Sequence, residues 1–255
     1  MMKRQLPTCT CALLFMFLAG CTPSGTITEA DDGIHVMAAA SLTDALTKLE
    51  SMYEEQTGET LVINYGSSGK LRQQINEGAP ADVFLSASVA DMKKVANASN
   101  LVDSVNLLEN KLVLVAAPEV ADSLSEWDDL TSANLRSLAI GQTETVPAGQ
   151  YAKQSLETLG MWEQLEESFI FGSDVRQVLT YVETGNADAG LVYQTDAETS
   201  EQVTIVAEAP EHSHEPIYYP VGLINDDEKA RHFYEWLQTD EALAVFEDFG
   251  FSGVS

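Results

Sequence analysis

The chain of 255 residues is 45% hydrophobic and strongly acidic, with a formal net charge of −27 at pH 7. Its length suits one large domain or two lobes, each with a sizeable core. The charge excludes nucleic acid as a partner, because a protein that binds a phosphate backbone needs a basic surface. An acidic surface of this kind favours solubility or a salty habitat.

The first twenty residues have the pattern of a secretory signal. Lys3 and Arg4 precede a short apolar run that ends in Leu-Ala-Gly-Cys21, which resembles the cleavage box of bacterial lipoproteins. We therefore predict a signal peptide over 1–20, a lipid on Cys21, and a flexible tether over 21–32. The protein is then exported to the periplasm or cell surface and anchored through Cys21. The alternative is an ordinary signal in which this cysteine stands by chance.

Cysteine usage agrees with a mature chain that has no disulfide. Cys9 and Cys11 lie in the predicted signal, and Cys21 would be acylated. An exported protein could form disulfides, but no thiol pair remains here, so the hydrophobic core must supply the stability.

Strand and helix patterns alternate along the rest of the chain. Apolar runs predict strands over 35–38, 61–65, 82–86, 111–116, 138–140, 169–171, 189–193, 203–207 and 217–224. Apolar side chains at helical spacing predict helices over 41–57, 68–77, 89–98, 148–159, 174–184, 195–200, 227–237 and 240–246. The alternation predicts an α/β fold with mixed, mostly parallel sheets and flanking helices. Ligands in such folds bind at the carboxyl ends of strands, beside helix starts.

The junction of the first strand and the first helix carries a hydroxyl group. Ser41 follows Ala38-Ala39-Ala40, and Asp44 stands three residues later as a partial capping box. The first N–H groups of a helix have no intrahelical partner and lie at the positive end of the helix dipole, so this junction can attract an anion. Ser41 taken alone is better explained as a structural N-cap.

The second strand-to-helix turn, Tyr65-Gly66-Ser67-Ser68-Gly69-Lys70, offers two hydroxyls between glycines that let the backbone approach a ligand. A plain Gly-Ser turn is the alternative. Ser67 and Lys70 also match the Ser-x-x-Lys of acyl-serine enzymes, although neither Ser-Asp-Asn nor Lys-Thr-Gly occurs in the chain. A serine acyl-transfer enzyme is therefore an alternative from a different functional class.

Two later helix starts and one strand end complete the candidate residues. Pro147 suits a first helical turn and leaves the N–H of Ala148 unpaired. Asp174 and Val175 open a further helix, and Tyr193 ends a strand with a phenol. Nothing in the local sequence distinguishes Ala148 or Val175 from ordinary helix residues, because a backbone donor leaves no mark on the side chain.

A histidine-containing loop is the one segment that suggests a metal. His212, His214 and Glu215 are too few ligands for a site, and a solvated loop explains them. We expect no cofactor and no cation ligands.

Taken together, these segments resemble the periplasmic molybdate-binding proteins of ABC importers over about residues 33–251. The motifs that match in order are Ala-Ala-Ala-Ser41-Leu-Thr, Gly78-Ala-Pro-Ala-Asp82-Val-Phe, Val146-Pro-Ala-Gly-Gln-Tyr-Ala152, Asp174-Val-Arg176, Gly190-Leu-Val-Tyr193 and Tyr219-Pro-Val221. The resemblance implies the two-lobed type II periplasmic-binding-protein fold. Residues 33–115 and 221–255 would form one lobe and 116–220 the other, with crossings near Ala116 and Tyr219-Pro220 and the ligand in the cleft.

The resemblance also implies the ligand-binding residues. They are the hydroxyls of Ser41 and Ser68, the backbone donors of Ala148 and Val175, and the phenol of Tyr193. Ser67 is the neighbour of Ser68. Lys70 follows Gly69 where some relatives carry hydroxyl residues, which makes Lys70 a candidate local cation.

The function implied is that of a receptor, not an enzyme. It would bind molybdate or tungstate with high affinity and deliver it to the permease and ATPase of an ABC importer. It would act as a monomer without a cofactor, with the lipid anchor as its membrane contact. A receptor for sulfate or another oxyanion is the alternative within this class. An adhesive surface lipoprotein is a further alternative, which predicts no stabilisation by a ligand.

Overall fold

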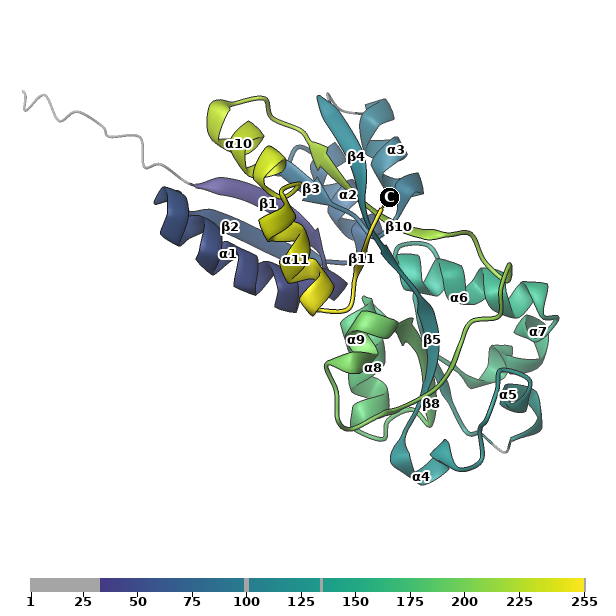
Figure 1. The fold of residues 1–255 in the computed structure, drawn as a ribbon. Helices are drawn as coiled ribbons and strands as arrows, with labels where there is room; N and C mark the ends of the chain where they lie inside the picture. The colour runs from purple at the N-terminus through teal and green to yellow at the C-terminus, as the bar shows by residue number, and fades with distance from the viewer. Residues whose placement is uncertain (1–32, 99–100, 134, 255) are drawn as a thin grey trace, which may run out of the picture. The chain divides into compact units, whose positions relative to one another are not determined.

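The computed structural model describes residues 33–98, 101–133 and 135–254, and Figure 1 shows how their helices and strands are arranged. The predicted signal peptide, the tether and Cys21 lie outside the described residues. The strands are β1 (Ile34–Ala39), β2 (Leu61–Gly66), β3 (Val83–Leu85), β4 (Asp103–Asn110), β5 (Leu112–Ala116), β6 (Leu138–Gly141), β7 (Phe169–Gly172), β8 (Ala189–Tyr193), β9 (Thr204–Glu208), β10 (Ile217–Leu223) and β11 (Ser252–Gly253). The helices are η1 (Ala40–Leu42), α1 (Thr43–Thr57), α2 (Ser68–Asn76), α3 (Val89–Ala98), α4 (Pro118–Ala121), α5 (Asp129–Ser132), α6 (Pro147–Thr158), α7 (Trp162–Leu165), η2 (Glu166–Ser168), α8 (Val175–Glu183), α9 (Gln194–Glu198), α10 (Glu228–Trp236) and α11 (Asp240–Asp248).

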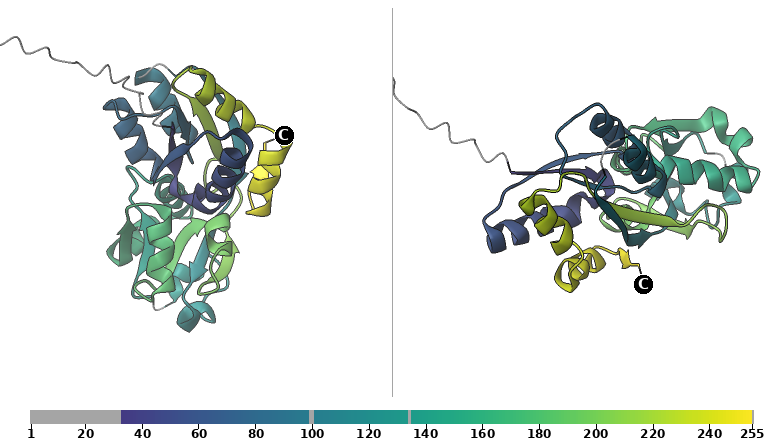
Figure 2. Two further views of the ribbon diagram at one scale, coloured as in Figure 1. Left: turned by 90° about the vertical axis from the view of Figure 1, so that its left-hand side faces the viewer. Right: turned by 90° about the horizontal axis from the view of Figure 1, so that it is seen from above.

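The first sheet has six strands in the order β11-β4-β10-β3-β1-β2. β1 is parallel to β2 and β3, whereas β10 is antiparallel to β3 and β4. Val36 and Met37 of β1 enter different cores, because neighbouring residues of a strand face opposite sides. Val36 belongs to the cluster with Leu46 of α1 and Phe233 of α10, and Met37 to the cluster with Leu71 of α2. The right-hand view of Figure 2 accordingly shows α2 on one side of this sheet and α10 and α11 on the other.

The second sheet has five strands in the order β7-β6-β8-β5-β9. β6 is parallel to β7 and β8, whereas β5 is antiparallel to β8 and β9. The prediction of mixed sheets is confirmed, but the prediction that they are mostly parallel is wrong. The antiparallel pairs involve the strands next to the crossings between the sheets. A strand that enters from the other sheet, without a helical crossover connection, is not constrained to run parallel to its neighbour.

The chain first crosses between the sheets at Lys111, which separates β4 from β5, and it returns before β10. β5 pairs along its whole length with β8, from Leu112 opposite Tyr193 to Ala116 opposite Ala189. The first crossing therefore precedes the expected position near Ala116, and residues 112–115 belong with the second sheet. The physical reason is that every residue of β5 is buried, which suits an inner strand covered on both faces. The other lobe limits stay a prediction.

Strand β4 has no counterpart among the predicted elements. Its first four residues are exposed, and only Leu107 and Leu108 are buried. The sequence therefore has no apolar pattern that would predict a strand here. Pairing with β10 and β11 holds this strand in the first sheet. The short helices α4, α5 and α7 were also not predicted, since four residues are too few for a periodic pattern. Within the described residues, no helix has the length and hydropathy needed to span a membrane.

Candidate functional site

A small cavity lies where helices from both sheets begin. It has a volume of about 10 Å³ and is lined by residues of η1, α2, α6 and α8 and by the end of β8. The five residues predicted for the ligand all line it: Ser41, Ser68, Ala148, Val175 and Tyr193. Ser67 lines it too, whereas Lys70 is not among the lining residues. Pockets for drug-sized molecules measure about 300–1,000 Å³, so a cavity of about 10 Å³ suits only a compact ligand.

Helix starts supply backbone donors on several sides of this cavity. Ser68 and Val175 are the first residues of α2 and α8, and Ala148 is the second residue of α6, after Pro147. N–H groups in a first turn have no intrahelical acceptor, and the helix dipole makes this end positive. The N–H of Gly69 is already used, because it donates to the carbonyl oxygen of Thr145 at 3.0 Å.

Ser41 lies within η1 and does not cap α1. The residue before α1 is Leu42, which makes no side-chain capping bond, so the predicted capping box is wrong. The strand enters a short 3-10 turn before the α-helix, which moves Ser41 one position too early for a cap. Its Oγ instead lies 2.9 Å from the phenol oxygen of Tyr219. Ser41 is 4% exposed and lines the cavity.

The two serines at the start of α2 differ in their hydrogen bonds. The Oγ of Ser68 accepts from the N–H of Ala87 at 2.9 Å, which leaves the serine proton for another acceptor. The Oγ of Ser67 is buried and has no hydrogen-bond partner among the described residues. Lys70 therefore makes no hydrogen bond that would activate Ser67 as a nucleophile.

Tyr193 brings a neutral phenol to the cavity from the end of β8. Its side chain is 1% exposed, and its hydroxyl has no hydrogen-bond partner among the described residues. Burial raises the pKa of Tyr193 well above its usual value, so the phenol keeps its proton at neutral pH. A buried donor without a partner is costly unless a ligand accepts its hydrogen bond.

The lining residues include neither lysine nor arginine, and the charged residue among them is Asp174. The carboxylate of Asp174 is occupied at the start of α8, where it accepts from the backbone N–H of Gln177 at 2.9 Å and the hydroxyl of Ser173 at 3.2 Å. Apart from this carboxylate, the polar groups that face a ligand are neutral hydroxyls and backbone amides.

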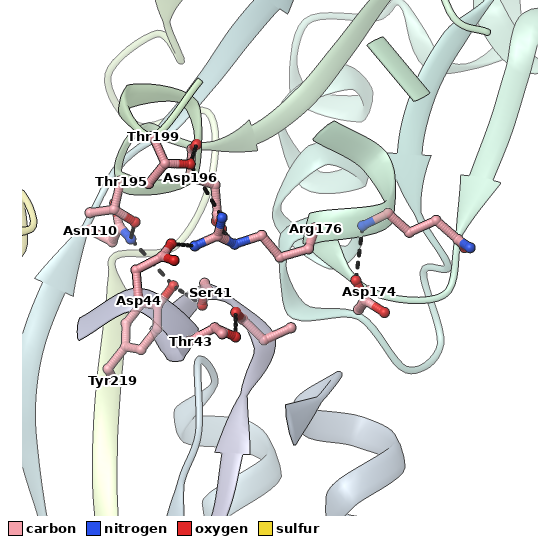
Figure 3. A network of polar contacts seen from close by, with 12 residues as sticks. Ser41, Thr43, Asp44, Asn110, Asp174, Arg176, Thr195, Asp196, Thr199 and Tyr219 are labelled. Atoms are coloured by element: carbon pink, nitrogen blue, oxygen red, sulfur yellow. Dashed lines mark hydrogen bonds and ion pairs between the residues drawn. The ribbon is translucent and has the colours of Figure 1, made fainter. Parts of the chain in front are cut away.

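Arg176 connects the two sheets beside the cavity without lining it (Figure 3). Its guanidinium pairs with Asp44 of α1 and lies 2.7 Å from a carboxylate oxygen of Asp196 in α9. Asp196 is fully buried, and this burial raises its pKa to about 7 against the opposing effect of Arg176. Two carboxylates thus surround Arg176, which leaves little of its positive charge for the ligand.

This arrangement can bind a compact anion that offers only acceptors. The described residues that line the cavity include no His, Cys, Lys or Arg that would act as a nucleophile or a base. Hydroxyls and backbone N–H groups supply the donors, and hydrogen bonds to a charged acceptor are worth roughly 1.5–3 kcal/mol each.

Tyr219 and Asn110 belong to the polar network around the cavity but were not predicted as site residues. Tyr219 was noted only as part of a Tyr-Pro-Val motif, and Asn110 ends the unpredicted strand β4. The signal available for Tyr219 was a tyrosine next to a proline inside an apolar strand. No sequence signal indicated Asn110, since its role depends on how β4 and β10 pair.

Comparison with known proteins agrees with this architecture. Residues 34–252 match the bacterial extracellular solute-binding protein family. YvgL of Bacillus subtilis (strain 168), named as a candidate ABC transporter substrate-binding lipoprotein, is 42% identical over 246 residues, which cover 93% of this chain and 94% of that protein. The molybdate-binding protein ModA of Haemophilus influenzae is 38% identical over 229 residues, which cover 86% of this chain and 89% of that protein. The solved structure of the periplasmic molybdate-binding protein of Azotobacter vinelandii is 25% identical with a TM-score of 0.78, and the match covers 87% of this chain and 100% of that one. The chain therefore belongs to the bacterial extracellular solute-binding proteins, which are transport receptors rather than enzymes, and within this family it is similar to the ModA proteins.

Proposed function

We propose that this protein binds molybdate, and also tungstate, in the cavity and delivers the anion to an ABC importer. The observation that carries the proposal is the donor composition of the cavity, where hydroxyls and helix-start amides from separate segments surround a small space. The names of the ModA relatives point to the same ligand. Ser41, Ser68, Ala148, Val175 and Tyr193 are the proposed contacts.

The energetics of such a site suit a tightly bound dianion. Five charge-assisted hydrogen bonds of roughly 1.5–3 kcal/mol each total about 7.5–15 kcal/mol, a range that spans the ~8–12 kcal/mol of micromolar to nanomolar binding. The upper part of this range leaves room for the desolvation of the anion and the loss of its freedom. The acidic surface does not oppose binding strongly, because surface charges are screened within about 8–10 Å whereas helix-start amides act at contact distance.

Donor composition and cavity size together would set the selectivity. Hydrogen phosphate carries an O–H group to which the backbone N–H groups offer no acceptor, so the site should disfavour it. Sulfate has no such group and would be separated from molybdate by its smaller size. A sulfate receptor is therefore the second candidate, and competition between the two anions distinguishes them.

The test is a thermal-denaturation and calorimetry screen of the mature protein with molybdate, tungstate, sulfate and phosphate. Molybdate and tungstate should each stabilise the fold by about 2.7 kcal/mol at a hundredfold excess over Kd, which corresponds to a rise in Tm of about 5–10 °C. A larger rise with sulfate than with molybdate would favour the second candidate. No heat and no stabilisation with any of the four anions would refute an oxyanion receptor.

Variants identify the proposed contacts. Ser41→Ala and Tyr193→Phe should each weaken molybdate binding about tenfold to a hundredfold while leaving the protein folded, because each removes one buried donor to a charged ligand. Ser51→Ala is the matched control, since Ser51 is exposed on α1 and bonds only to its own helix. Wild-type affinity in both cavity variants would remove these residues from the site.

We also propose that the mature protein is a monomer held at the membrane by a lipid on Cys21. The lipoprotein pattern before Cys21 and the lipoprotein name of the YvgL relative support the anchor. Cys21→Ser should release the protein from the membrane fraction and abolish the mass added by acyl chains. A Cys21→Ser protein that stays in the membrane fraction would contradict the anchor.

A further inference from the structure

We propose that Asn110 and Tyr219 form a hydrogen-bond relay that fixes the direction of the Ser41 hydroxyl, so that this hydroxyl can only donate to the ligand. The inference rests on the proposed function, because it concerns how Ser41 recognises a fully deprotonated oxyanion. It assigns roles as positioning residues to Asn110 and Tyr219, which were not predicted as ligand contacts. Figure 3 shows the three side chains together with Thr195.

The orientation of the Asn110 amide is set by the backbone next to it. The N–H of Lys111 donates to Oδ1 of Asn110 at 2.8 Å, so this end of the amide must be the oxygen. The nitrogen end then faces the hydroxyl of Thr195 at 2.8 Å and the phenol oxygen of Tyr219 at 3.3 Å. An amide NH2 group donates and does not accept. Tyr219 therefore accepts a hydrogen bond from Asn110.

The proton of Tyr219 must consequently point elsewhere. The other partner of this phenol is Oγ of Ser41, at 2.9 Å. Tyr219 is only 2% exposed, so solvent does not compete for the proton. Burial raises the pKa of Tyr219 well above its usual value, which keeps the phenol protonated. Tyr219 thus donates to Ser41.

The proton of the Ser41 hydroxyl then needs an acceptor. The Oγ of Ser41 accepts from Tyr219, and Tyr219 is the one hydrogen-bond partner of this oxygen among the described residues. Because Ser41 is buried and lines the cavity, the ligand supplies the acceptor. Consecutive hydrogen bonds that run in one direction also polarise one another, which strengthens the final donor. Ser68 reaches the same state by another route, through the N–H of Ala87.

The relay predicts how the site selects between molybdate and hydrogen phosphate. A free serine hydroxyl can rotate and accept a hydrogen bond, so it would tolerate the O–H of hydrogen phosphate. A Ser41 hydroxyl that accepts from Tyr219 can accept from the ligand as well only if its own buried proton is left without an acceptor. The relay should therefore favour molybdate over hydrogen phosphate, in addition to its effect on molybdate affinity.

Tyr219→Phe breaks the relay while it keeps the ring. Calorimetry at about pH 8 would measure molybdate binding directly and phosphate binding by displacement of molybdate. The variant should bind molybdate about tenfold more weakly, as expected for one hydrogen bond, while hydrogen phosphate binds as before. The preference for molybdate then shrinks about tenfold. Tyr218→Phe is the matched control, because neighbouring residues of β10 face opposite sides of the sheet.

Asn110→Asp would reverse the relay at nearly constant shape. A carboxylate only accepts, so Tyr219 would donate to the introduced carboxylate and accept from Ser41, whose lone pairs would then face the ligand. Molybdate affinity should fall about a hundredfold, and affinity for hydrogen phosphate much less. Asn106→Asp adds the same charge to an exposed position of the same strand and should change molybdate affinity less than about threefold.

The outcomes separate the relay from the proposed function. Wild-type affinity and wild-type preference in Tyr219→Phe, with wild-type protein binding molybdate, would overturn the relay and leave the receptor intact. Equal losses for molybdate and hydrogen phosphate in both relay variants would also overturn it, since that pattern indicates general damage. A wild-type protein that binds neither anion would refute the receptor and the relay together.

Discussion

At Gly69, the backbone of a helix on the first sheet closely approaches the backbone of a segment that leads into a helix on the second sheet. Gly69 is the second residue of α2, and its N–H donates at 3.0 Å to the carbonyl of Thr145, which precedes α6. A Cβ at position 69 would lie 2.5 Å from the oxygen of Thr145, 2.7 Å from its Cα and 2.9 Å from its carbonyl carbon. All three are backbone atoms, so no change of side-chain rotamer relieves the clash. Gly69→Ala must therefore move α2 away from α6.

Two opposing effects determine the magnitude. Alanine is better than glycine in a helix by about 0.5–1 kcal/mol, which stabilises any arrangement in which α2 and α6 are apart. Overpacking costs about 1–3 kcal/mol in the arrangement described here. If molybdate binds between α2 and α6, the overpacking lowers its binding free energy by the same amount. Each ~1.4 kcal/mol corresponds to a tenfold change in Kd. We expect affinity to fall about 5- to 150-fold, whereas the ligand-free protein keeps its stability or gains up to ~1 kcal/mol.

The assay pairs molybdate calorimetry with urea unfolding of the ligand-free protein. Gly253→Ala is the control, because its Cβ would meet only a carboxylate oxygen of Glu247 at 3.9 Å and the residue does not line the cavity. This control should bind molybdate within about threefold of wild type. Unchanged molybdate affinity in Gly69→Ala would show that binding does not need the contact between Gly69 and Thr145.

Two further predictions concern the ion pairs beside the cavity. Asp44→Asn removes the pair that joins Arg176 to α1, and because both side chains are partly exposed it should weaken molybdate binding only about two- to fivefold. Calorimetry at low and high salt checks this, since screening should shrink the difference, and a salt-independent loss would contradict it. Asp196 has its pKa raised from 3.8 to about 7 in the folded protein. Between these values the folded state keeps a proton that the unfolded chain has released, so this group makes stability fall as pH rises from about 4 to about 7, by at most ~1.4 kcal/mol per pH unit. Asp196→Asn should lack this pH-dependent contribution. The measurement is the free energy of unfolding in urea as a function of pH for both proteins, and an equal dependence on pH from about 4 to about 7 would refute the prediction.

The sequence contained most of the elements that build the site. Apolar runs and helical spacing predicted the junctions that lead into Ser41, Ser68, Ala148 and Val175, because hydrophobic periodicity is a local property. The resemblance to molybdate-binding proteins added their order and spacing. Strand β4 was missed since its polar residues are held by pairing with β10, which is a non-local interaction.

The backbone donors show why local sequence alone could not predict every residue of the site. Ala148 and Val175 are ordinary as residues, and their importance comes only from the position of their N–H groups at helix starts. Ser41 shows the reverse case, since its sequence suggested a helix cap and its hydroxyl instead meets Tyr219, 178 positions further along the chain.

The sequence by itself determined the class of fold, the junctions at which helices begin, and the acidic character of the chain. These follow from composition and from spacing over a few residues. Only the tertiary structure decided that Gly69 meets Thr145, that Arg176 joins Asp44 to Asp196, and which way the Ser41 hydroxyl points. The direction of a hydrogen bond depends on the partners at both ends, and here those partners come from segments that only the pairing and packing of the two sheets bring together.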